Sequence, residues 1–221
     1  MKLACNALIK FTVGLALVGA LLFLPAGSFG YTNAWLFIGL LFAPMLILGI
    51  VLLIKSPALL KKRLDAKEKQ HAQNGVVAAA ALLFLAGFVV AGLDFRFGWS
   101  HMPAWAVIVA SVVLLISYAL YAEVMRENAY LSRTIEVQNG QKVVDTGLYG
   151  IVRHPMYAVT IWLFLAIPVL LGSLYALLCF LPYIPVIVVR ILNEEKLLTE
   201  ELEGYAEYKK RVKYRLLPLI W

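Results

Sequence analysis

Five long apolar stretches alternate with polar connections along the chain. They cover residues 8–24, 34–54, 76–93, 103–122 and 158–189. Each of the first four has the length of one helix across a hydrocarbon core, which takes about 20 residues. With Lys2 before it and Lys10 near its start, the first resembles the charged and apolar regions of a signal peptide, but it is long and ends at a poor cleavage site, Pro25-Ala26-Gly27. We therefore expect it to be a retained membrane span.

The fifth stretch has 32 residues, which is too long for one ordinary span. Leu171-Gly172-Ser173 lies near its middle, and three prolines interrupt it. This pattern predicts a tight helical hairpin whose first arm is short and reaches only partway across the membrane. The fold class is then an all-α, polytopic transmembrane helical bundle of about six membrane segments.

The basic residues test this arrangement. Nineteen of the 20 are Lys2 and Lys10 at the N-terminus or lie in loop 55–75, in segment 123–157 or in the tail from residue 190, and Arg96 is the exception. Cytoplasmic loops of membrane proteins collect Lys and Arg. The pattern therefore predicts a multi-pass protein with both termini in the cytoplasm, as an even number of crossings requires.

The composition agrees with a membrane protein. The chain is 62% hydrophobic and 15% charged, with a mean hydropathy of +0.84, whereas soluble domains are about 45–50% apolar and about 25% charged. Membrane lipids are the expected partners. The net charge of +7 does not indicate nucleic acid, because no basic stripe interleaves with aromatic residues. Cys5 and Cys179 give no zinc or disulfide spacing, and we expect no metal.

The polar segment 123–157 carries the first candidate chemistry. The fourth span is expected to continue as a helix through Arg126, followed by a turn at Asn139-Gly140 and a short extended piece at 141–144. Pro155 suits the first turn of a helix. The free amides of that helix N-terminus, next to Arg153 and His154, could bind a carboxylate. Alternatively, these two residues merely flank a membrane helix, as basic residues often do.

The tail after the hairpin carries the second group of candidate functional residues. Its apolar residues recur at spacings of four, three, three and four, which predicts one face of a cytoplasmic amphipathic helix: Leu198, Leu202, Tyr205, Tyr208 and Val212. A helix lying on the lipid headgroups would show the same pattern. Glu194 and Glu195 follow the last span directly, where carboxylates are costly without partners. If the hairpin closes, they meet the basic pair at its other end, either as a binding site or as structural salt bridges.

The two segments together resemble the superfamily of isoprenylcysteine carboxyl methyltransferases and phospholipid methyltransferases, which are integral membrane enzymes. The matching text is VVDTGLYGIVRHPMY, then EEKLL, then GYAEYKKRVKYRLLP. The similarity covers roughly the last 90 residues. We therefore divide the chain into four N-terminal transmembrane helices, 1–122, and a methyltransferase core, 123–221.

The resemblance implies an S-adenosylmethionine-dependent methyltransferase whose cofactor site lies outside a Rossmann fold. Carried over onto this sequence, it implies eight cofactor-binding residues: Lys142, Val144, Gly147, Tyr149, His154, Pro155, Glu194 and Glu195. It places Arg215 and Tyr208 on the methyl-acceptor side, and we add Arg153 as a catalytic candidate. Leu148 and Gly150 depart from the usual pattern, and the first of these is expected to affect loop stiffness more than chemistry.

The acceptor is expected to be a lipophilic small molecule or a lipidated chain. A carboxylate is ionised at pH 7 and needs an anchoring cation, which Arg215 or Arg153 can supply. A lipid amine must first lose a proton and needs a base such as Glu207 or His154. The late basic run favours carboxyl O-methylation of an isoprenylcysteine-like acceptor over N-methylation of a phospholipid or other lipid amine.

Two functions of other classes remain open. A transporter would carry ionisable residues within its spans, and the interiors of the apolar stretches have none. A non-catalytic membrane scaffold would have lost motif residues, and the main ones are present. Binding of S-adenosylhomocysteine would distinguish the enzyme from both.

Overall fold

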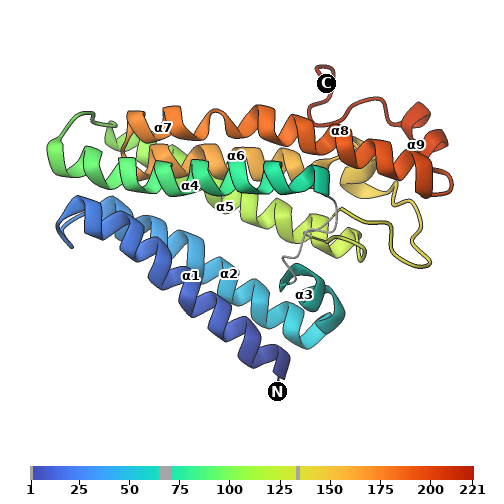
Figure 1. Ribbon diagram of the computed structural model, residues 1–221, viewed down its shortest axis with the longest axis horizontal. Coiled ribbons are helices and arrows are strands. Elements are labelled where there is room, and N and C mark those ends of the chain that lie inside the picture. Colours follow the sequence, from blue (N-terminus) through green and yellow to red (C-terminus); the bar gives the residue numbers. More distant parts are fainter. Residues whose placement is uncertain (1, 65–70, 133–134) are drawn as a thin grey trace.

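A computed structural model of the chain describes residues 2–64, 71–132 and 135–221. These residues are helical without strands, and the helices of the second half lie roughly along one axis (Figure 1). Three helical hairpins make up most of the molecule: α1 (Lys2–Ala26) with α2 (Thr32–Lys55), α4 (His71–Phe97) with α5 (Ala104–Glu127), and α6 (Pro155–Leu171) with α7 (Leu174–Phe180) and α8 (Tyr183–Glu201).

The three hairpin turns lie at one end of the molecule (Figure 1). The short helices α3 (Pro57–Leu64) and α9 (Tyr205–Arg211) lie at the other end, together with the long connection between α5 and α6, which contains the 3-10 turn η1 (Gly147–Gly150). The polar, motif-bearing segments are therefore gathered at one end. We call it the polar end.

The predicted fold class is confirmed. Among the described residues, five helical stretches are long and apolar enough to cross a membrane: α1, α2, α4 from Asn74, α5, and α7 joined to α8. Helix α6 is apolar but shorter, as predicted for the first arm of the hairpin. The number of crossings and the cytoplasmic location of the termini stay predictions. Lys67, Lys69 and Arg133, which support that location, lie outside the described residues.

Several predicted boundaries are also confirmed. Helix α5 continues through Arg126, the chain turns at Asn139-Gly140, and Pro155 is the first residue of α6. The hairpin reverses at Gly172-Ser173, close to the middle of the 32-residue stretch.

The predicted amphipathic tail helix differs from the structure in one respect. Helix α8 ends at Glu201 and α9 begins at Tyr205, so the tail is bent rather than continuous. The bend follows from Gly204, whose φ of +81° lies in the left-handed region that favours glycine. The predicted apolar residues still share one cluster, but they reach it from both sides of the bend and pack on Val137 and Val143.

The main core lies between the hairpins. Leu22, Phe37, Phe88, Leu170 and Phe180 belong to one buried cluster. Helices α1 and α4 pack closely at Gly92. A Cβ added at this position would lie 2.6 Å from a carbonyl oxygen of α1. Such small residues allow close helix packing in a membrane protein.

A buried carboxylate fastens the hairpin turn at the end opposite the polar end. Asp94 is 1% exposed and lies just past the predicted apolar stretch. Its Oδ1 accepts from the Ser100 amide at 2.7 Å, and its Oδ2 accepts from the hydroxyls of Ser100 and Ser173. The Ser173 hydroxyl also caps α7 by accepting from the amide of Ala176 at 3.0 Å. This network ties the turn of the third hairpin to the second hairpin.

Candidate functional site

The two motif segments meet where the hairpin closes at the polar end. Arg153 Nε donates to Glu195 Oε1 at 2.6 Å, and His154 Nε2 lies 3.3 Å from the same oxygen. The other carboxylate oxygen, Oε2, accepts from Arg215 Nε at 2.9 Å. Glu195 is 3% exposed, so one buried carboxylate joins the start of α6, the middle of α8 and the tail. We call these four residues the Glu195 cluster.

Backbone pairing reinforces this cluster. The amides of Arg153 and His154 donate to the carbonyls of Tyr214 and Arg215, each at 2.9 Å. Arg153 Nη1 also donates to the carbonyls of Val212 and Lys213, at 2.7 and 2.8 Å. The tail is thus fixed along the segment that precedes α6. The prediction that acids and bases from both ends of the hairpin come together is confirmed by this geometry.

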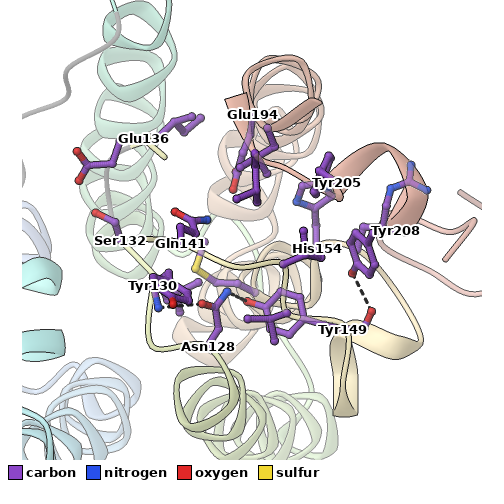
Figure 2. A pocket seen from close by; sticks show the side chains of 18 of the residues that line it. Asn128, Tyr130, Ser132, Glu136, Gln141, Tyr149, His154, Glu194, Tyr205 and Tyr208 are labelled. Carbon is purple, nitrogen blue, oxygen red and sulfur yellow. Dashed lines mark hydrogen bonds between the residues drawn. The ribbon is translucent and has the colours of Figure 1, made fainter. Parts of the chain in front are cut away.

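A cleft lies beside the Glu195 cluster. It holds about 830 Å³ of empty space, counting the part that opens to solvent. Its walls come from the α5–α6 connection, the start of α6, α8 and the tail (Figure 2). Its polar lining combines tyrosines, acids and bases: Asn128, Tyr130, Ser132, Glu136, Gln141, Lys142, Tyr149, Arg153, His154, Tyr157, Arg190, Glu194, Tyr205 and Tyr208.

Hydrogen bonds hold several of these side chains in place. The Tyr157 hydroxyl donates to Glu194 Oε2 at 2.6 Å and accepts from Arg190 Nε at 3.0 Å. The Tyr149 hydroxyl accepts from Asn128 Nδ2 at 3.0 Å, and the Tyr149 carbonyl accepts from the Tyr208 hydroxyl at 2.7 Å (Figure 2). Burial raises the pKa of Tyr149 and Tyr208 well above its ordinary value, so both stay neutral at physiological pH.

Tyr205 differs from the other tyrosines of the cleft. Its hydroxyl is buried and, among the described residues, has no hydrogen-bond partner. Burial raises its pKa, so it stays protonated and keeps a hydrogen to donate. A buried hydroxyl without a partner costs about 1–3 kcal/mol. A polar group of a ligand in the cleft would remove that cost.

Five of the eight predicted cofactor-binding residues line the cleft: Lys142, Val144, Tyr149, His154 and Glu194. The other three lie around it. Glu195 belongs to the buried cluster, Pro155 starts α6, and Gly147 starts η1. At Gly147 the φ is +51° and an added Cβ would lie 1.4 Å from the Glu127 carboxylate, which accepts from the next amide at 3.0 Å. This glycine therefore shapes the loop behind the cleft.

The three predicted catalytic residues have different surroundings. Tyr208 and Arg153 line the cleft, but both already bond to the protein. Arg215 does not line it, and lies in a shallow groove on the other side of Glu195 with its guanidinium 5.0 Å from the centre of the Trp221 ring. Glu207, the alternative base, lies on the exposed side of α9.

Sequence reasoning missed part of the lining. Asn128, Tyr130, Ser132, Glu136 and Gln141 come from the irregular segment after α5, where no periodicity indicates which side chains turn inward. From the sequence, Arg190 stands out only as the first basic residue of the tail and Tyr205 only as one of the apolar residues on the face of the tail helix. The spacing of four residues between Arg190 and Glu194 on one helix could have indicated that they share a face.

The fold and this site define an integral membrane protein with a polar cleft at one end of a helical bundle. Residues 105–200 match the family described as "Isoprenylcysteine carboxyl methyltransferase (ICMT) family". The predicted resemblance is therefore confirmed: over these residues the chain is similar to this family of membrane methyltransferases. The match includes α5, the α5–α6 connection and the hairpin, but ends before Tyr208 and Arg215. A search of curated proteins found no significant match.

Proposed function

We propose that this chain is an S-adenosylmethionine-dependent methyltransferase that acts on a lipophilic acceptor at the membrane surface. The observation that carries the proposal is the cleft beside the Glu195 cluster, because it lies at the polar end of the bundle and most of its lining falls within residues 105–200, which match a methyltransferase family. A site there has access to a water-soluble methyl donor on one side and to membrane-borne acceptors on the other.

The lining of the cleft suits S-adenosylmethionine, which supplies an activated methyl group on its sulfonium when bound. The tyrosine rings offer flat surfaces for the adenine. Glu194 can accept from hydroxyls or an ammonium group, and Lys142 can pair with a carboxylate. The buried hydroxyl of Tyr205, which has no partner among the described residues, offers a donor for a further polar group of the ligand.

The residues of the Glu195 cluster would act mainly by positioning the site. Arg153 and His154 precede α6 and line the cleft, and Glu195 holds both. Methyl transfer requires the donor and acceptor to be aligned, which a rigid frame promotes. We assign the direct cofactor contacts to Lys142, Val144, Tyr149, His154, Glu194 and Tyr205, with Gly147, Pro155 and Glu195 supporting them.

Carboxyl O-methylation of an isoprenylcysteine-like acceptor is the favoured reaction. Besides Lys142, which we assign to the cofactor, Arg190 lines the cleft, and a second cation there supports an anionic acceptor. Glu207 lies on the exposed side of α9, and His154 already pairs with Glu195, so neither stands as a ready base for an amine. N-methylation of a lipid amine is the second candidate, which the carboxylate of Glu194 in the cleft supports.

A methyl-transfer assay with chemically distinct acceptors tests the proposal. Purified protein in lipid vesicles receives S-adenosylmethionine labelled in the methyl group, with either an S-prenylated cysteine carrying a free carboxylate or phosphatidylethanolamine. O-methylation gives an ester whose label is released by mild base, whereas an N-methyl label resists base. We expect base-labile label on the prenylated cysteine. Label that resists base would favour the amine reaction, and no transfer to either acceptor would count against the proposal.

A further inference from the structure

Helix α3 packs behind a wall of the cleft although it belongs to the N-terminal part of the chain. It follows α2 directly and is outside the residues that match the methyltransferase family. Its Leu59 is 6% exposed and belongs to a buried cluster with Val124, Met125, Leu131 and Tyr149. The last two of these also line the cleft. Helix α3 thus packs behind a wall of the proposed cofactor site.

Arg63, at the end of α3, bonds to this wall. Its Nη1 donates to the carbonyl of Ser132 at 3.1 Å and lies 3.9 Å from the sulfur of Met156. Its Nη2 donates to the hydroxyl of Tyr121 on α5, and the guanidinium lies 5.4 Å from the centre of that ring. Ser132 and Met156 both line the cleft. One side chain of α3 therefore ties the wall to α5 and to the start of α6.

Lys62 makes a second connection. Its Nζ donates to Gln138 Oε1 and to the carbonyl of Ala129, the latter at 3.4 Å, and it lies 5.8 Å from the centre of the Tyr130 ring. Gln138 in turn donates from Nε2 to the carbonyl of Tyr130 at 2.6 Å. Lys62 thus joins the early part of the wall to its later part, on either side of residues 133–134.

The wall depends on such contacts because it has no regular structure of its own. Residues 128–132 and 135–141, which we call the wall segment, contain turns but neither helix nor strand. A chain without a helical or strand ladder must find partners for its carbonyls elsewhere. Helix α3 supplies donors to two of them, at residues 129 and 132, and these donors are charged, which strengthens the bonds.

We propose that α3, through Arg63 and Lys62, positions the wall segment and thereby sets the affinity of the cleft for the adenosyl cofactor. This inference rests on the proposed function. It gives the N-terminal hairpin a part in the site, because α1 also reaches α3, with Lys10 Nζ donating to the carbonyl of Leu64 at 2.5 Å. Arg63 and Lys62 are positioning residues, since they act through the wall.

Two measurements on matched variants test this inference. Arg63→Ala and Lys62→Met remove the two connections, Arg63→Lys retains the charge, and Lys61→Ala changes an exposed residue of the same helix. Calorimetry gives the Kd for S-adenosylhomocysteine in nanodiscs, and hydrogen exchange with mass spectrometry follows peptides of the wall segment. A thermal scan checks that each variant is folded.

We expect Arg63→Ala to weaken binding of S-adenosylhomocysteine about tenfold, as the loss of one charge-assisted hydrogen bond would. Hydrogen exchange in the wall segment should become faster. The melting temperature should stay near that of Lys61→Ala. Arg63→Lys should restore part of the affinity, and Lys62→Met should behave like Arg63→Ala. Unchanged exchange, or faster exchange with an unchanged Kd, would overturn the inference. If the wild-type protein itself bound no ligand, the proposed function would fail, whereas the exchange comparison would still decide whether α3 holds the wall.

Discussion

Replacing Glu195 by Gln perturbs the buried carboxylate that joins α6, α8 and the tail. Its side chain is 4% exposed and faces Arg153, which is 5% exposed, and Arg215, which is 28% exposed. The substitution keeps the shape but removes the negative charge. A Gln can accept from one arginine only, and its NH₂ group then faces the donor of the other.

The expected loss of stability depends on the hydrogen bonds and solvation that each arginine retains in the variant. Breaking a buried ion pair by changing one partner costs about 3–5 kcal/mol. Arg153 retains its bonds to two backbone carbonyls, and Arg215 is partly solvated, so we expect the lower end, about 3 kcal/mol. For a chain of this length that corresponds to a fall of roughly 6–12 °C in melting temperature.

The assay is thermal unfolding of purified protein in one detergent, with Glu200→Gln as the matched control. Glu200 lies on the same helix and is exposed, so its substitution should change the free energy of unfolding by no more than about 0.5 kcal/mol. Glu194→Gln, which changes the adjacent carboxylate in the cleft, should also remain folded. If Glu195→Gln melted together with the control, the reasoning that this carboxylate holds the hairpin to the tail would be refuted.

Three further substitutions separate binding from folding. Tyr205→Phe removes a buried hydroxyl that has no partner among the described residues. Calorimetry should show that S-adenosylhomocysteine binds about 2- to 10-fold more weakly. The melting temperature should be unchanged or higher, and a lower one would contradict this. Gly92→Ala introduces a methyl group where α1 and α4 touch and should cost about 1–3 kcal/mol in thermal unfolding, whereas Gly39→Ala, which meets nothing within 4 Å, should not. Asp94→Ala leaves the hydroxyls at the hairpin turn without their acceptor and should lower the free energy of unfolding by about 1–3 kcal/mol. The Kd of ligand bound at the opposite end of the bundle should change little. A variant as stable as the wild type would argue against the role of Asp94 in the turn.

Much of the fold could be predicted from the sequence because the bilayer imposes simple rules. Apolar length predicts spans, and the small residues at Gly172-Ser173 predict the reversal of the last hairpin. The bend before α9 could not be read from the apolar spacing alone. The spacing of Leu198 to Val212 fits one helix, and a left-handed residue at Gly204 changes direction without breaking the spacing.

The site was partly predictable for a similar reason. Charged residues beside a membrane span need partners, so Glu195 was expected near Arg153 and His154, as the structure has it. Which of the two neighbouring glutamates lines the cleft could not be predicted, because it depends on the direction in which each side chain points from α8. Glu194 lines the cleft, whereas Glu195 faces the buried cluster. The contribution of α3 is set by tertiary contacts that no local pattern reports.

Titration calorimetry of S-adenosylhomocysteine into the protein in nanodiscs tests the central claim most directly, with Glu194→Gln and Glu200→Gln measured alongside. The account predicts saturable binding to the wild type and to Glu200→Gln, and strongly weakened binding to Glu194→Gln, whose side chain lines the cleft. Folded wild-type protein that takes up no ligand, or equal binding by all three proteins, would contradict the assignment of the cleft as the cofactor site.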